Sequence, residues 1–223
     1  MTDRDGAGNP VALPHVSARS LGPVRLPGWV RAVIIACCLI EALLLGAALL
    51  GYPALRFGAF ALGAFWSPVL AEGVGIYPGQ PVLMFATHGF LHAGLLHLAM
   101  NMISLAALAP QLARLIGAGR MALVYAAAQV AGAALFGVMQ PQAGPMIGAS
   151  GAVFGVAGAL VVTTAATLRR RNRPTGPLLR AVLLILGLNL ALTVLMPSIA
   201  WEAHLGGALA GSLLGLLFLR RAG

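Results

Sequence analysis

The chain has 223 residues, of which 60% are hydrophobic and 9% are charged, and its formal net charge is +9. Soluble domains carry roughly a quarter charged residues, so this composition excludes an ordinary soluble domain and indicates a polytopic membrane protein. With about 20 residues per span and short loops, the length accommodates about six transmembrane helices and leaves no room for a sizeable soluble domain.

Residues 1–28 are polar and rich in proline, glycine and serine, which predicts a disordered cytoplasmic tail ahead of a membrane domain over residues 29–221. The first span is predicted over residues 29–50. Glu41 lies near its middle, where a carboxylate is costly unless it faces the interior of the helix bundle. Glu41 has either a structural or a functional role in that interior.

Residues 52–86 form a long connection whose apolar pieces are interrupted by prolines and glycines, and neither piece is long enough to cross a bilayer. Trp66, Tyr77 and several phenylalanines favour a segment that lies in the membrane interface. Long loops with structure of their own are often functional, so we expect this connection to take part in function.

The second span is predicted over residues 88–109, ending at Pro110. It carries many polar side chains for a membrane helix: His88, His92, His97 and Asn101. His97 and Asn101 are four residues apart and therefore share one helix face. A zinc site built from the three histidines lacks the carboxylate or cysteine that such a site needs, so we predict no metal here.

The remaining spans are predicted over residues 118–139, 148–168, 178–196 and 201–219. All 14 basic residues are arginine, and only Arg56 lies outside the segments that would share one side of the membrane. The positive-inside rule therefore predicts that both termini are cytoplasmic. The arginine run at 169–173 is interpreted as a stop-transfer anchor that attracts anionic lipid, not as a nucleic-acid site. The composition is rich in alanine, glycine, leucine and arginine and free of lysine, which is typical of a high-GC bacterium. It therefore favours a bacterial inner membrane.

With this orientation, the second, fourth and sixth spans all enter the membrane from the outer face. Ser150 lies at the outer end of the fourth span, His204 at the outer end of the sixth, and His97 with Asn101 on the outer half of the second. At a rise of about 1.5 Å per residue these side chains reach comparable depth. Chance placement would scatter them over both halves of the bilayer, so we expect them to converge.

Small residues permit this convergence. Three glycines share a helix face with His204: Gly207, Gly211 and Gly215. Such a face lets the sixth span pack closely on the fourth and bring the His204 imidazole to the Ser150 hydroxyl. In the alternative interpretation these glycines serve packing alone, and Ser150 bonds only within its own helix.

The convergence predicts a nucleophile and a base. Ser150 is the candidate nucleophile and His204 the candidate general base. The Ser150 N–H, the Asn101 amide and the His97 ring would stabilise an oxyanion. No aspartate or glutamate is positioned as a third member, so a dyad is predicted. Phe154, one turn after Ser150, would pack against the imidazole.

Three motifs follow one another in the chain: His97-Leu-Ala-Met-Asn101, Gly148-Ala-Ser150-Gly151, and Ala203-His204 followed by Gly207 and Gly211. In these motifs the chain resembles the rhomboid intramembrane serine proteases, over about residues 30–220. The resemblance implies a six-transmembrane-helix rhomboid-like bundle whose membrane-interfacial first loop is the long connection at 52–86.

The resemblance also implies roles for single residues. Ser150 and His204 would form the catalytic dyad, and His97 and Asn101 would line the oxyanion hole. Gly148, Gly151 and Phe154 would support the dyad, Phe154 replacing the family's tyrosine. His92 would have a structural or a water-handling role, and His88 a structural one. No cofactor is implied, and the substrates would be single-pass transmembrane proteins, cleaved near the outer face.

The chain departs from the family where many members carry Trp-Arg shortly before the second span, because here the stretch is Leu83-Met84. We therefore expect the first loop to be anchored differently. Two alternative functions are a non-catalytic relative that binds membrane proteins for quality control, and a small transporter. Both Ser150 and His204 are present, which argues against the first. The absence of an internal repeat argues against the second.

Overall fold

The computed structural model of the chain describes residues 25–195 and 199–220. Residues 1–24 of the predicted tail lie outside the described residues. Within the described ranges the extended pairing is limited to an isolated bridge between Phe65 and Met146. In chain order the helices are α1 (Gly28–Leu49), α2 (Ala54–Gly63), α3 (Ser67–Glu72), α4 (Gln80–Thr87), the 3-10 turn η1 (His88–Phe90), α5 (Leu95–Ile116), α6 (Ala118–Met139), α7 (Ser150–Arg170), α8 (Gly176–Leu195) and α9 (Trp201–Arg220).

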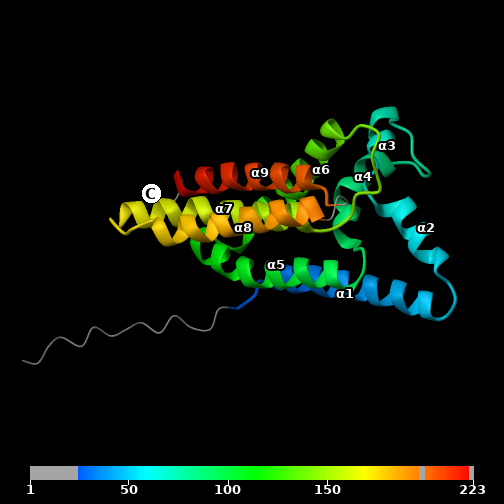
Figure 1. Cartoon of the computed structure of the whole chain (residues 1–223), viewed down its shortest axis with the longest axis horizontal. Coiled ribbons are helices and arrows are strands. Elements are labelled where there is room, and N and C mark those ends of the chain that lie inside the picture. Colours follow the sequence, from blue (N-terminus) through cyan, green and yellow to red (C-terminus); the bar gives the residue numbers. More distant parts are fainter. Residues whose placement is uncertain (1–24, 196–198, 221–223) are drawn as a thin grey trace, which may run out of the picture.

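Six of these helices are long and apolar enough to cross a membrane: α1, α5, α6, α7, α8 and α9. They run roughly along the long axis of the molecule, whereas the short helices α2, α3 and α4 gather at one end (Figure 1). Each long helix has about the length that a bilayer requires. The prediction of an all-helical integral membrane protein with six spans is therefore confirmed.

The second span begins later than predicted. It is α5, whose bounds are Leu95–Ile116 in place of 88–109. Gly94 precedes it with a φ of 96°, a conformation that interrupts a helix and that glycine adopts without strain. His88 and His92 consequently lie in the connection ahead of the span. The prediction that three histidines enter one membrane helix is wrong.

Pro110 lies inside α5 and does not end the second span, which corrects a further prediction. A proline removes one backbone donor and usually kinks or breaks a helix. Membrane helices tolerate proline because neighbouring helices and local backbone adjustments satisfy the freed carbonyl. Pro110 is buried between its neighbours, and the helix continues past it to Ile116.

Glycines bring α7 and α9 into backbone contact. A Cβ on Gly207 would clash with the carbonyl of Gly151, and a Cβ on Gly211 would clash with the carbonyl of Gly155. Only glycine fits at both positions of α9, as the glycine spacing predicted. The close approach sets the first turn of α9 beside the first turn of α7.

The connection at 52–86 folds into α2, α3 and α4. Phe65 and Met84 are buried in a small apolar cluster with Phe136 of α6, and Phe65 exchanges two backbone hydrogen bonds of 2.9 Å with Met146. The connection also exposes apolar side chains such as Phe57. Its location in the membrane interface stays a prediction.

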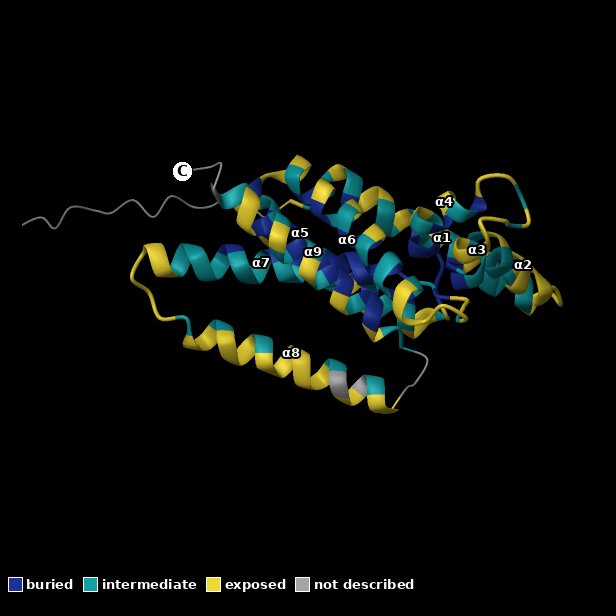
Figure 2. Cartoon of the chain, turned by 90° about the horizontal axis from the view of Figure 1, so that it is seen from above, coloured by how far each residue is buried: buried dark blue, intermediate teal, exposed yellow. Residues whose placement is uncertain are grey.

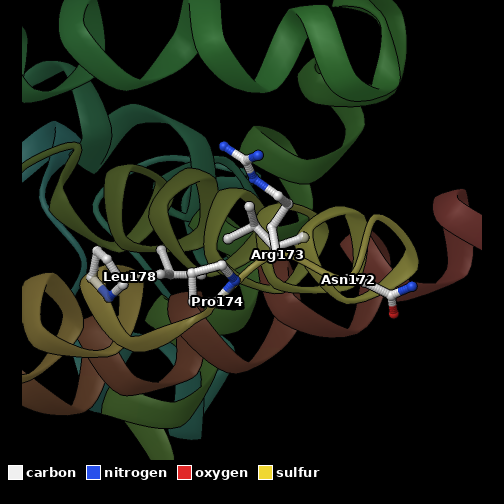
Figure 3. Close-up of a pocket in the computed structure, with 6 residues that line it drawn as sticks. Asn172, Arg173, Pro174 and Leu178 are labelled. Atoms are coloured by element: carbon white, nitrogen blue, oxygen red, sulfur yellow. The ribbon is translucent and has the colours of Figure 1, made fainter.

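Among the long helices, α8 is set apart from the others (Figure 2), and none of its described residues is buried. The turn between α7 and α8 forms an open hollow (Figure 3) lined by Leu168, Asn172, Arg173, Pro174, Pro177 and Leu178. This hollow lies at the C-terminal end of α7. By helix length it is about 30 Å from Ser150 at the other end, so it is separate from the predicted site.

Candidate active site

Ser150 begins α7, and His204 lies in the first turn of α9. The distance from Ser150 Oγ to His204 Nε2 is 2.9 Å, which is a hydrogen-bond distance. Both side chains are partly buried. The hydroxyl donates to Nε2 when the other ring nitrogen, Nδ1, carries the imidazole proton. A hydroxyl nucleophile and a general base require a hydrogen bond of this kind.

Two glycines allow other groups to approach Ser150. Gly148 has a φ of 115°, and a Cβ there would lie 2.8 Å from the His97 ring. A Cβ on Gly151 would lie 3.3 Å from the carbonyl oxygen of Ala203, the residue before His204. The backbone on either side of Ser150 therefore lies against the two histidine-bearing helices, α5 and α9.

Phe154 stacks on the His204 imidazole. The ring centroids are 4.3 Å apart and the planes differ by 8°. Phe154 lies one turn after Ser150 on α7, so the same helix supplies both the hydroxyl and the surface that supports the imidazole. Stacking restricts rotation of the ring about its side-chain bonds and keeps Nε2 directed at Ser150.

His97 and Asn101 lie in the first two turns of α5. The Ala93 N–H donates to His97 Nδ1 at 3.3 Å, which leaves the ring proton on Nε2, next to Gly148. Asn101 is buried, and its Nδ2 donates to the His97 carbonyl at 2.9 Å. An amide nitrogen has two protons, so Asn101 retains a second donor.

The arrangement has the chemical groups that acyl transfer needs. The Ser150 N–H is the first of α7, and the first N–H groups of a helix have no acceptor within that helix. The positive end of the helix dipole lies at the same place. With the Nε2–H of His97, these donors can stabilise negative charge on a carbonyl oxygen attacked by Ser150.

His88 and His92 lie ahead of α5 and have different surroundings. The Nδ1–H of His88 donates to the Met84 carbonyl at 2.7 Å, and Nε2 accepts from Gln129 at 2.7 Å. His92 is fully buried, and no described protein atom bonds either of its ring nitrogens. Its ring lies 5.2 Å from that of His97. Burial lowers the pKa of both His88 and His92 to about 4, so both are neutral at pH 7.

Glu41 pairs with Arg56, a contact that the sequence analysis did not predict. Arg56 donates to the two carboxylate oxygens at 2.8 and 3.1 Å and to the His92 carbonyl at 3.0 Å. The Glu41 side chain is 1% exposed. A sequence signal existed: Arg56 is the one arginine assigned to the outer side, and Glu41 is the one acid inside the first span. Their pairing favours the structural role for Glu41.

Asn189 of α8 was also missed. Its Nδ2 lies 3.2 Å and its Oδ1 3.3 Å from His204 Nδ1, the ring nitrogen that faces away from Ser150. Glu202, by contrast, is buried and accepts a hydrogen bond of 2.7 Å from Gln140. A single asparagine within an apolar span indicates a polar contact in the interior of the bundle, but the sequence does not show with which residue.

Fold and site together define a polytopic membrane protein with a serine–histidine pair near one end of its helix bundle. The family model described as the rhomboid domain matches residues 78–221. The chain belongs to the rhomboid family.

Several curated proteins share this similarity. The chain is 33% identical over 121 residues to "Rhomboid protease GluP" of Bacillus subtilis, which covers 54% of this chain and 23% of that protein. It is 36% identical over 132 residues to "RHOMBOID-like protein 1" of Arabidopsis thaliana, covering 59% and 33%. It is 32% identical over 131 residues to "Putative rhomboid protease YdcA" of B. subtilis, covering 59% and 64%. The chain thus spans less than two thirds of the length of these relatives.

Proposed function

We propose that this protein is an intramembrane serine endopeptidase in which Ser150 is the nucleophile and His204 the general base. The observation that carries the proposal is the 2.9 Å distance between Ser150 Oγ and His204 Nε2. The two residues lie on α7 and α9, whose backbones are in contact at glycines. Membership of the rhomboid family supports it, because relatives such as "Rhomboid protease GluP" are named as proteases.

In the proposed reaction, Ser150 Oγ attacks the carbonyl carbon of the scissile peptide bond while His204 Nε2 takes the hydroxyl proton. The tetrahedral intermediate collapses when the imidazolium returns this proton to the leaving nitrogen, and the C–N bond breaks. A water molecule then gives its proton to His204 and attacks the acyl-enzyme. Collapse of the second intermediate releases the carboxyl product and restores the Ser150 hydroxyl.

The oxyanion of both intermediates would be stabilised by the Ser150 N–H, the His97 Nε2–H and the second N–H of Asn101. Gly148 and Gly151 let these donors approach the reacting carbonyl. His92, buried next to the His97 ring, supports that ring from the connection ahead of α5. The proposed reaction uses no cofactor or metal.

The proposed substrates are single-pass transmembrane proteins, cleaved near the outer face of a bacterial inner membrane. The support is topological. Ser150 begins α7, and the arginine-rich run at 169–173 starts with the last two residues of the same helix. Positive residues favour the cytoplasmic side. In this proposed orientation both termini would be cytoplasmic and Ser150 would lie at the outer end of the bundle.

The test is cleavage of a single-span model substrate in proteoliposomes. We expect wild-type protein to cleave it, and Ser150→Ala and His204→Ala to leave no measurable product. Ser104→Ala, which removes a serine of α5, is the matched control and should keep activity. Cleavage by Ser150→Ala would refute the proposed nucleophile. A wild-type protein that captures the substrate without cleaving it would support a quality-control binder instead.

A further inference from the structure

We infer that Asn189 of α8 is a positioning residue for His204, which holds the imidazole in the tautomer that can accept the serine proton. The inference about the tautomer stands on its own geometry, and its catalytic consequence rests on the function proposed above. Asn189 belongs to none of the three motifs that identify the site in the sequence.

The geometry of the imidazole carries the inference. His204 Nε2 faces Ser150 Oγ at 2.9 Å, and Nδ1 faces the Asn189 amide at 3.2 and 3.3 Å. A neutral imidazole has one proton, so the group bonded to Nδ1 decides what Nε2 can do. Hydrogen bonds to the two ring nitrogens of His204 therefore connect α9 to α7 on one side and to α8 on the other.

The orientation of the Asn189 amide selects between two states. With Oδ1 directed at Nδ1, the ring donates Nδ1–H to Asn189, and the Nε2 lone pair accepts the Ser150 proton. With Nδ2 directed at Nδ1, the ring nitrogen must accept, the proton sits on Nε2, and His204 cannot act as the base for Ser150. The first orientation also suits the imidazolium, since Nδ1 then keeps a proton and Oδ1 still accepts it.

The other neighbours of His204 leave this role to Asn189. Phe154 stacks on the face of the ring and has no hydrogen-bonding group. The nearby carboxylate of Glu202 accepts a hydrogen bond from Gln140, and its residue lies two positions away along α9. Within the described contacts of His204, the Asn189 amide is the group that hydrogen-bonds Nδ1.

Asn189 also connects α8 to the site. None of the described residues of α8 is buried, and Figure 2 shows this helix apart from the other long helices. In the parts of the chain that the structure describes, the Asn189–His204 contact is the side-chain hydrogen bond that joins α8 to another helix. A donor and an acceptor more than about 3.5 Å apart no longer form a hydrogen bond, so the hydrogen bond between Asn189 and His204 depends on the position of α8.

The direct test is the tautomer of His204, read from the ¹⁵N shifts of the imidazole in histidine-labelled protein in lipid nanodiscs. The chain has five histidines, and the His204 signals are assigned by their loss in His204→Gln. We expect wild-type His204 to carry its proton on Nδ1. Asn189→Leu, which keeps the side-chain size but cannot bond Nδ1, should shift the population toward Nε2–H. Asn189→Asp, which can only accept, should retain Nδ1–H.

Kinetics give a second readout. Losing the bond to Nδ1 should lower kcat about 10- to 100-fold in Asn189→Leu with KM changed less than about threefold, and Asn189→Asp should recover most of it. Leu188→Ala, at an exposed neighbouring position of α8, is the control and should leave kcat and the tautomer unchanged. A protein that never cleaves but shows the tautomer shift would refute the proposed function and keep this inference. An active Asn189→Leu variant with unchanged kcat and tautomer would overturn this inference alone.

Discussion

Arg56 of α2 and Glu41 of α1 form a two-point ion pair, with Nη2–Oε1 at 2.8 Å and Nη1–Oε2 at 3.1 Å. The third contact of Arg56, to the His92 carbonyl, joins the pair to the connection just ahead of α5. One guanidinium therefore ties together the first span, the long loop and the segment that precedes His97.

The two partners differ in exposure, which predicts unequal effects of removing each. The Arg56 side chain is 24% exposed, whereas that of Glu41 is 1% exposed. Arg56→Gln leaves a carboxylate buried without its cation and should cost about 3 kcal/mol of unfolding free energy. Glu41→Gln should cost less, because the guanidinium can reach solvent. Unfolding in mixed detergent micelles measures both.

A double variant is the control for this pair. Arg56→Gln combined with Glu41→Gln leaves no uncompensated charge and should recover stability relative to Arg56→Gln alone. If the double variant were as unstable as the sum of the two single variants, the ion pair would not be the interaction that matters.

Gly148 is predicted to be intolerant of a side chain for two separate reasons. Its φ of 115° strains any L-residue, and a Cβ would lie 2.8 Å from the His97 ring. Gly148→Ala should displace His97, the proposed oxyanion donor, and lower kcat at least about 100-fold, the usual effect of losing one such donor. Gly94→Ala is the matched control: its φ is 96°, but no atom lies within 4 Å of the new Cβ. It should lose stability and keep most of its activity when folded.

The meeting of Ser150 and His204 could be predicted from the sequence, whereas the start of the second span could not. Span ends, arginine placement and helical rise were sufficient to bring Ser150 and His204 to one depth, because their positions depend on periodicity and topology alone. The start of the second span was predicted wrongly because the span was taken to end at Pro110, so that a span of bilayer length had to begin near His88. The backbone conformation of Gly94 decides the boundary, and hydropathy does not report it.

A contact between two isolated polar residues on different helices could not be predicted from the sequence. Asn189 stands alone in an apolar span, so no spacing pointed to His204, and only the packing of α8 brings the two together. The Glu41–Arg56 pair has the same character: each residue was noticed, but the path of the 52–86 loop determines that they meet. Local pattern gives the depth and face of a residue, and tertiary packing gives its partner.

The close approach of α7 and α9 predicts that alanine is not tolerated on the glycine face of α9. Gly207→Ala should separate α9 from the Gly151 carbonyl, because the added Cβ would overlap it. The variant should lose its activity and have a lower unfolding temperature. Gly187→Ala on α8 is the control, because nothing lies within 4 Å of the added Cβ. It should be neutral or slightly stabilising, since alanine favours helix formation. An active Gly207→Ala protein would contradict the packing described.

Acid should destabilise the fold through His88. Burial lowers the pKa of His88 to about 4 from an ordinary value near 6.5, against the opposing effect of its hydrogen bond to Met84. The unfolded chain therefore binds the proton first, and stability is complete above about pH 6.5 and falls as the pH decreases toward 4. The loss from this residue should reach about 3 kcal/mol.

The measurement for His88 is unfolding free energy against pH. His88→Asn, which keeps a donor for the Met84 carbonyl but does not titrate, should start less stable at pH 7 and show a shallower slope between pH 6.5 and 4. A slope equal to that of the wild type would assign the acid sensitivity to other groups, of which His92, with its pKa also lowered to about 4 by burial, is the next to test.

Phe154 is predicted to act through its ring face. The 4.3 Å stack on His204 holds the imidazole plane, so Phe154→Leu, similar in volume but without a ring, should lower kcat about two- to tenfold, the worth of an aromatic pair. Phe154→Tyr keeps the ring face and should retain activity, with KM unchanged in both variants because the ring contacts His204, the proposed base. Steady-state cleavage by both variants, with expression and melting temperature as controls, distinguishes ring stacking from simple packing. Equal kcat for the leucine and tyrosine variants would mean that volume alone is required.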